Sequence, residues 1–427
     1  MLSDDDFQQI SKDCDLQQYK LIQEMRSSVD HATDSKMSVL PELELTALLS
    51  ARSAQDNIAL NFLSAGSYNN FLPAIVKAEQ QCLDFAKTLS NKAADNVIQN
   101  IGNQLSAVAE TASWYVFADD YITLLANLLI FCHRESTQFE SQAVSKVLIP
   151  ATVSPVLRQA LRSQLKYQDI DLVIVDYDKI SGCISLQQLE QFDDENILAV
   201  VFGWPNFFGL LEEITLISQW ANNRECQLIG LSNPLSLSVL SSPFELTDGK
   251  LDYLLGDLQG SGLAVNQSGI SASFLASRQA ISGELKSYLR SQKYNRKLSF
   301  IDAYLSQSGI SGLTQSANKS NQNLNLLVEK LCSIDGVSKK FTTTAINECV
   351  IEIAQIDIEK ALKILAGHNM VFGYLLQHEF PELANCVLIY CSDQHTQSDI
   401  EKVVKKVETV VKNLSTAGCP VKPKFNV

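Results

Sequence analysis

The stretch that decides the fold is VVFGWPNFFG, from Val200 to Gly209, an apolar run that ends at a proline and an Asn-Phe-Phe-Gly loop. Such a run, bounded by turn residues, predicts a buried strand that delivers a loop to a cleft. The next residues, 210–226, have helical apolar spacing, and QLIGLSNP at 227–234 predicts a second strand with its own Asn-Pro loop. A strand, helix, strand unit favours a parallel pair, and ligands of open α/β sheets gather at the carboxyl ends of such strands.

Short strand-like runs and amphipathic helices alternate on both sides of this unit, whereas the first 135 residues show mostly helical patterns. This alternation predicts a doubly wound, mostly parallel sheet of roughly six or seven strands. The strand candidates are 146–150, 171–178, 197–205, 227–232, 252–258 and 270–277.

Between Lys286 and Asn325 the composition turns to Ser, Gln, Asn and Gly, which predicts a loop or weak helical junction between domains. Three further strand candidates follow, CVIEIA, MVFGYLL and NCVLIYCS. They indicate a small C-terminal α/β domain.

The last helix has the clearest pattern in the chain. Its apolar stripe runs from Ile400 to Leu414, and Ser398 and Glu401 predict a capping box at its start. The expected organisation is therefore an N-terminal helical arm over 1–60, a large α/β domain over 61–310 and a small α/β domain over 311–427.

Composition narrows the classes of partner. The 427 residues are 46% hydrophobic, enough for about two or three domains with large cores. The 34 basic and 48 acidic residues give a net charge of −14 without any basic block, which argues against nucleic acid or an anionic membrane as partner.

The cysteines and the first residues of the chain predict the cellular compartment and whether the chain binds a metal. The ten cysteines form no CxxC pair and no His lies at ligand spacing from a Cys pair, so they indicate reduced thiols and no metal site. The start, MLSDDDFQQISKDCD, lacks the pattern of a signal peptide, and no apolar run has the length of a membrane span. We expect a cytoplasmic protein with no membrane contact.

Four segments resemble, in the same order, subunit 1 of glycine dehydrogenase (decarboxylating), the P-protein of the glycine cleavage system. They are FLSAGSYNNFLPAIV, VVFGWPNFFGLLEEI, GLSNPLSLSVLSSPFEL and FGYLLQHEFPELANCVLIYCSD, at 62–76, 200–214, 230–246 and 372–393. The resemblance implies the fold-type I architecture of pyridoxal-phosphate-dependent transferases, with a mostly parallel seven-stranded sheet in the large domain and a small C-terminal α/β domain.

The resemblance also implies a division of labour between two subunits. The lysine-bearing P-protein subunit 2 holds pyridoxal phosphate, decarboxylates glycine and passes the aminomethyl group to the lipoyl arm of the H-protein. Subunit 1 lacks the cofactor lysine and completes the active site from across the interface. This chain is then a subunit that is not active alone, with no catalytic and no cofactor-binding residues of its own.

The residues can be tested against this implication. A fold-type I enzyme needs a lysine just past the strand that follows its cofactor-aspartate strand, because the Schiff base forms there. No lysine occurs from Leu251 through Leu285, and Lys250 precedes the strand. Ser232 and Asn233 stand where a carboxylate for the pyridine nitrogen is expected. We therefore do not expect this chain to bind pyridoxal phosphate by itself, which disfavours an independent transferase.

At two places the sequence differs from that of subunit 1, and both differences favour an alternative function. The segment at 82–105 predicts a plain helix where the family has a Tyr- and Pro-rich loop. ADDYITLLANL keeps Asp120 and Thr123 of the family's YDGATALAEA, but Tyr121 replaces a glycine and crowds a helix N-terminus suited to phosphate. The alternative is a catalytically inactive, diverged paralogue, a pseudoenzyme that acts as scaffold or regulator.

The candidates for the substrate cleft or the subunit interface lie in loops of the resembling segments, except Gln259, which lies in GDLQGSG at 256–262, the counterpart of the family's GEGQPLG. They are Ser67, Tyr68, Asn69, Asn206, Phe207, Gly209, Asn233 and Gln259. Structural alternatives stay open for them: capped turns for the polar residues and core packing for the aromatic one.

Overall fold

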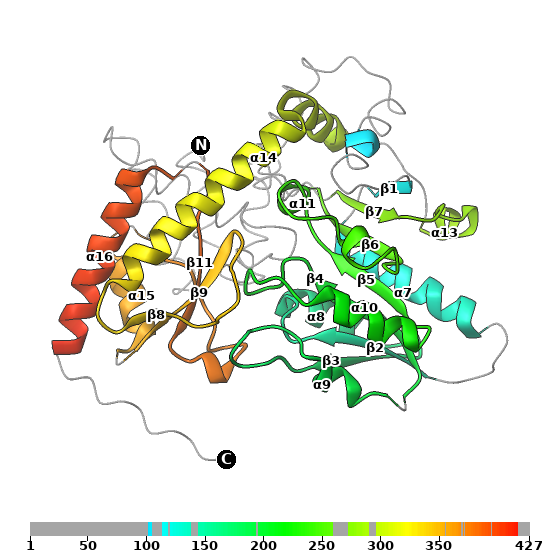
Figure 1. Cartoon of the computed structure of the whole chain (residues 1–427), viewed down its shortest axis with the longest axis horizontal. Helices are drawn as coiled ribbons and strands as arrows, with labels where there is room; N and C mark the ends of the chain where they lie inside the picture. The colour runs from blue at the N-terminus through cyan, green and yellow to red at the C-terminus, as the bar shows by residue number, and fades with distance from the viewer. Residues whose placement is uncertain are drawn as a thin grey trace, which may run out of the picture.

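The structure is a computed structural model. It describes residues 101–104, 113–117, 120–137, 144–193, 195–258, 272–289, 296–354, 356–368, 370, 372–393 and 395–416. The predicted N-terminal arm and the segment at 62–76 lie outside these residues. Figure 1 shows a large and a small sheet side by side, with one long helix running from one to the other.

The large sheet has seven strands in the order β1-β7-β6-β5-β4-β2-β3. Strands β2 to β6 pair in parallel, while β7 is antiparallel to both β6 and β1. This confirms the predicted mostly parallel sheet of seven strands. The bounds are β1 Ser113–Phe117, β2 Ser145–Pro150, β3 Ile170–Val175, β4 Ile197–Gly203, β5 Gln227–Leu231, β6 Tyr253–Asp257 and β7 Ser273–Ser277.

Helices cover both faces of this sheet. On one face lie α7 (Tyr121–Thr137), α8 (Pro155–Leu165) and α13 (Gly283–Tyr288). On the other lie α9 (Leu186–Glu190), α10 (Ile214–Asn223), α11 (Pro234–Leu237) and α12 (Pro243–Leu246). All seven residues of β4 are buried as a consequence, which is why its sequence is an uninterrupted apolar run.

The Ser-, Gln- and Asn-rich segment, for which composition predicts a loop or weak helical junction, is instead the long helix α14, Arg296–Cys332, bent at Gly309. Leu313 and Ala317 pack on the core of the large sheet, and Leu324 and Leu331 pack on that of the small sheet. These residues recur at helical spacing among polar neighbours, so the apolar stripe stabilises a helix that composition conceals. The predicted domain boundary at residue 310 falls next to the bend.

The small sheet is antiparallel, in the order β10-β11-β9-β8. Three helices, the second half of α14 together with α15 and α16, supply its apolar cover. The bounds are β8 Val337–Lys339, β9 Glu348–Ile353, α15 Ile358–Ala366, β10 Tyr374–Leu375, the 3-10 turn η3 Pro381–Leu383, β11 Cys386–Tyr390 and α16 Gln397–Thr416.

The apolar stripe of α16 is buried as predicted, but its predicted capping box is wrong. The cap lies two residues earlier: Thr396 Oγ1 accepts from the backbone N–H of Asp399 at 3.3 Å, and Asp399 Oδ2 accepts from that of Thr396 at 3.1 Å. Ser398 already lies inside the first turn. Thr396 and Asp399 thus make the two reciprocal side-chain to backbone hydrogen bonds of a capping box, with aspartate in place of the usual glutamate.

No helix in the described part of the chain is both long and apolar enough to cross a membrane.

Candidate functional site

The carboxyl ends of β2, β4 and β5 meet at the edge of the large sheet that faces the small sheet. A bridge between Leu210 and Ala345, and a hydrogen bond of 2.7 Å from the Ile346 N–H to the Gly209 carbonyl, join the loop after β4 to the small sheet's side. The candidates Asn206, Phe207, Gly209 and Asn233 all lie at this edge. Ser67, Tyr68, Asn69 and Gln259 lie outside the described residues.

Asn206 organises the loop that follows β4. Its Oδ1 accepts from the backbone N–H groups of Phe208 and Leu210, both at 3.0 Å. Its Nδ2 donates to Glu212 Oε1 at 2.8 Å and to the Gly182 carbonyl at 3.0 Å. The side chain is fully buried, so all of these bonds are made within this chain.

Glu212, which sequence analysis missed, is the hub of this loop. It is 3% exposed, and its Oε1 accepts from Thr152 Oγ1 at 2.8 Å as well as from Asn206. Its Oε2 accepts from the backbone N–H of Ile184 at 2.7 Å. Burial raises the pKa of this carboxyl above its ordinary value, and the three hydrogen bonds oppose that shift. One side chain therefore ties together the segments after β2, β3 and β4.

Phe207 and the adjacent Phe208 are both fully buried. The Phe208 ring lies 5.2 Å from Tyr177, 4.9 Å from Phe341 and 5.0 Å from Phe380, measured between ring centroids. The first of these residues follows β3, and the other two belong to the part that carries the small sheet. The ring of the candidate Phe207 lies 5.9 Å from Phe380 and 6.2 Å from Tyr374, so it too packs inside this chain, between its two parts.

Gly209 is required at the next position for two reasons. Its φ of +78° is unfavourable for other residues, and a Cβ there would lie 2.2 Å from the Glu348 carbonyl oxygen. The loop after β4 and the start of β9 are therefore in direct backbone contact.

Asn233 and Ser232 follow β5. Asn233 Oδ1 accepts from the Ser236 N–H at 2.9 Å and so caps α11, while the Ser232 hydroxyl donates to the Trp204 carbonyl. A Cβ at Gly256 would lie 1.6 Å from the Ser232 carbonyl oxygen, so the ends of β5 and β6 are closely packed. Both polar side chains therefore hydrogen-bond to backbone groups of this chain.

Asp120 occupies the start of α7. Its Oδ1 accepts from the Thr123 N–H at 2.9 Å and its Oδ2 from the Thr123 hydroxyl at 2.8 Å. Tyr121 is 4% exposed and packs into the core. A carboxylate already supplies the negative charge that this helix terminus favours.

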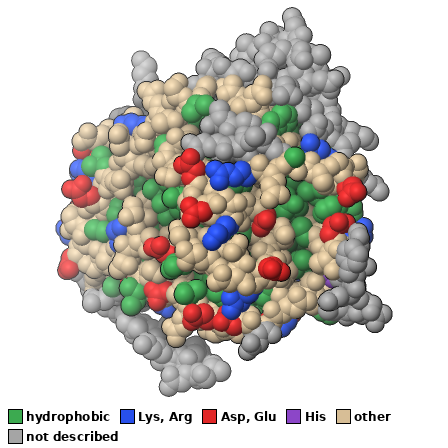
Figure 2. Space-filling model, turned by 45° about the vertical axis from the view of Figure 1, so that its right-hand side comes forward, with side chains coloured by type: hydrophobic (Ala, Val, Ile, Leu, Met, Phe, Trp, Pro, Cys, Tyr) green, Lys and Arg blue, Asp and Glu red, His purple; other side chains and the backbone are tan. Residues whose placement is uncertain are grey.

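Within the described ranges no three His, Cys, Asp or Glu side chains are grouped so that they could hold a metal ion. On the face drawn in Figure 2, Lys and Arg side chains are interspersed with Asp and Glu.

Comparison with known proteins gives consistent matches. The family model described as glycine cleavage system P-protein matches residues 119–289. The probable glycine dehydrogenase (decarboxylating) subunit 1 of Nitrosospira multiformis is 28% identical, over 88% of this chain and 90% of that protein. Its counterpart from Nitrosomonas europaea is 26% identical, over 85% and 87% respectively.

Solved structures show the same fold. The crystal structure of glycine decarboxylase (P-protein) of the glycine cleavage system, in inhibitor-bound form, superposes with a TM-score of 0.58 at 20% identity, covering 74% of this chain and 76% of that one. A NifS-like protein from Rickettsia africae gives 0.58 at 16% identity, covering 78% and 96%. The fold-type I architecture is confirmed, and the matches agree with the resemblance seen in the sequence: the chain is similar to the glycine cleavage system P-protein and to glycine dehydrogenase (decarboxylating) subunit 1.

Proposed function

We propose that this chain is subunit 1 of a glycine dehydrogenase (decarboxylating). In this role it pairs with the lysine-bearing P-protein subunit 2, whose active site it completes for glycine decarboxylation and aminomethyl transfer to the lipoyl arm of the H-protein. The names of the two relatives, whose own length is mostly covered by the match, support this assignment.

The residues of this chain do not fit a pyridoxal phosphate of its own. Lys250 lies ahead of β6, at the end opposite to the loop that would carry a Schiff-base lysine, and no lysine follows until Lys286. The Ser232 hydroxyl, where a carboxylate for the pyridine nitrogen is expected, donates to a backbone carbonyl. The proposal therefore assigns pyridoxal phosphate to the partner subunit, and no chemical step to this chain.

The observation that carries the proposal is the filled carboxyl edge of the large sheet. Asn206, Glu212 and Phe208 hold the loop after β4 against its own neighbours and against the small sheet's side, so that the described part of this edge is a packed wall. A stiff wall suits a subunit that shapes a cleft for another chain, because positioning requires little motion of the positioning residues.

The described cysteines support placing the complex in the cytoplasm. Those at 132, 183, 226, 332, 349, 386 and 391 are all free thiols. Free thiols are typical of a reducing compartment.

The second candidate function is the pseudoenzyme, a scaffold or regulator without glycine cleavage activity. Tyr121 favours it, because this residue replaces the family's glycine at the start of α7, where the family resemblance places a phosphate-type site, and its side chain is buried there.

Co-expression with the lysine-bearing subunit from the same genome separates the two candidates. We expect the two chains to co-elute in size-exclusion chromatography and the complex to catalyse glycine–bicarbonate exchange, while this chain alone catalyses none. The visible absorbance of lysine-bound pyridoxal phosphate is expected in the partner and absent from this chain alone. Co-elution without exchange would favour the pseudoenzyme, and separate elution would contradict the subunit assignment.

A further inference from the structure

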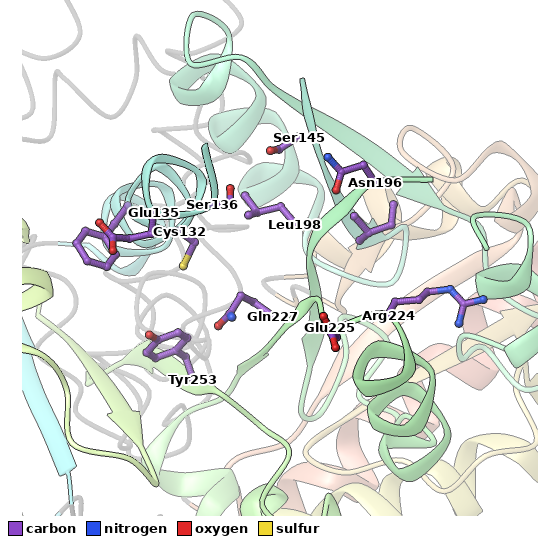
Figure 3. A pocket seen from close by; sticks show the side chains of 12 residues that line it. Cys132, Glu135, Ser136, Ser145, Asn196, Leu198, Arg224, Glu225, Gln227 and Tyr253 are labelled. Carbon is purple, nitrogen blue, oxygen red and sulfur yellow. The ribbon is translucent and has the colours of Figure 1, made fainter. Parts of the chain in front are cut away.

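A pocket of about 570 Å³ lies at the opposite edge of the large sheet, away from the loops described above. The first residues of four strands line it: Ser145 of β2, Ile197 of β4, Gln227 of β5 and Tyr253 of β6. The last turns of α7 form another wall (Figure 3). Neither proposed function uses this place.

Two acidic side chains and one basic side chain line the pocket. Glu135 of α7 and Glu225, just before β5, contribute two carboxylates. The one basic side chain in the lining, Arg224, forms an ion pair with Asp193 and stacks on Trp220, with its guanidinium carbon 4.4 Å from the ring centroid. In Figure 3 it extends away from the pocket. The cationic charge of Arg224 is therefore neutralised outside the pocket.

The end of α7 adds to this negative potential. The last carbonyl groups of an α-helix lack partners within the helix, and its dipole places partial negative charge there. The thiol of Cys132 faces the opening in Figure 3, and burial first, and then the charge of Asp252, raise its pKa to about 12.

The uncharged part of the lining completes a site for an organic cation. The rings of Phe131 and Tyr253 and the amide of Gln227 also line the pocket. Aromatic rings attract cations to their faces, and an amide oxygen accepts hydrogen bonds. Since no group of three carboxylate, thiol or imidazole ligands occurs among the described residues, the lining does not match a metal site. We propose that this pocket binds a small organic cation that carries an ammonium group.

Calorimetric titration of the full-length protein with putrescine tests the proposal, with succinate as a probe of similar length and opposite charge. We expect one putrescine per chain, no binding of succinate, and affinity that falls with added salt. Glu225→Gln should weaken putrescine binding about tenfold, because it removes one carboxylate from the lining. Glu329→Gln, the same change at an exposed position of α14, should leave the affinity as it is.

A second variant tests the proposal even if Glu225→Gln does not fold. Ser136 is exposed on the last turn of α7, where a lysine suits the helix dipole, so Ser136→Lys should keep the melting temperature. It puts an ammonium group at the pocket and should abolish putrescine binding. The proposal is overturned if putrescine gives no binding heat, if succinate binds equally well, or if folded Glu225→Gln and Ser136→Lys bind putrescine like the wild type. None of these outcomes depends on glycine cleavage.

Discussion

Replacing Glu212 by alanine is expected to lower the free energy of unfolding by about 3 to 5 kcal/mol. The substitution leaves three buried donors without their acceptor: the Thr152 hydroxyl, the Asn206 amide and the Ile184 N–H. Each unsatisfied buried polar group costs roughly 1 to 3 kcal/mol. Urea denaturation followed by circular dichroism measures the change.

The adjacent Glu213 provides a matched control. It is exposed, and its side chain makes no capping hydrogen bond to α10, so Glu213→Ala should change the unfolding free energy by less than about 0.5 kcal/mol. If both variants lost the same free energy of unfolding, Glu212 would not be the residue that holds the three segments together.

The same carboxyl should give stability a recognisable pH dependence. Burial raises the pKa of Glu212 in the folded state above its ordinary 4.5, so the folded protein binds this proton more tightly than the unfolded chain does. The stability contributed by protonation is complete below the unfolded pKa and is lost as the pH rises through the folded one. Glu212→Gln should lack this fall when urea midpoints are compared from mildly acidic to neutral pH. A parallel pH profile in the variant would show that another group titrates.

Six of the seven strands of the large sheet, β2 to β7, were predictable because each is largely buried and its sequence is mostly apolar. Strand β1 was missed because SWYVF is short and lies among helical patterns, and its partner β7 is far away in the chain. Helix α14 was missed because its stabilisation comes from two cores that it joins, not from its own composition.

In the candidate site, too, the sequence predicted the features that depend on local residues and missed those that depend on distant contacts. The loop chemistry of Asn206 and Asn233 is local, so Asn-Pro and Pro-Asn signals were enough to locate both turns. Glu212 carries no local signal that separates it from Glu213, because what distinguishes it is contact with segments that follow two other strands. Long-range packing decides which of two adjacent glutamates is buried.

Phe208→Ala is expected to lower the free energy of unfolding by about 3 to 5 kcal/mol, as truncation of a fully buried phenylalanine does. The ring contacts Tyr177 from the large sheet's side and Phe341 and Phe380 from the small sheet's side, so its removal weakens the joint between the two parts most directly. Hydrogen exchange should therefore accelerate at β9 and η3 more than in β2 or β4. Thermal unfolding and exchange mass spectrometry measure both effects.

The exposed Ile180 is the control, because it is 68% exposed on the large sheet's side of the same joint. Ile180→Ala should stay within about 0.5 kcal/mol of the wild type. If the loop after β4 is a wall held by this aromatic cluster, Phe208→Ala should also weaken co-elution with the lysine-bearing subunit at temperatures where the variant is still folded, whereas Ile180→Ala should not. Uniform acceleration of exchange over both sheets would instead mean that Phe208 stabilises the fold as a whole and does not specifically hold the wall in place.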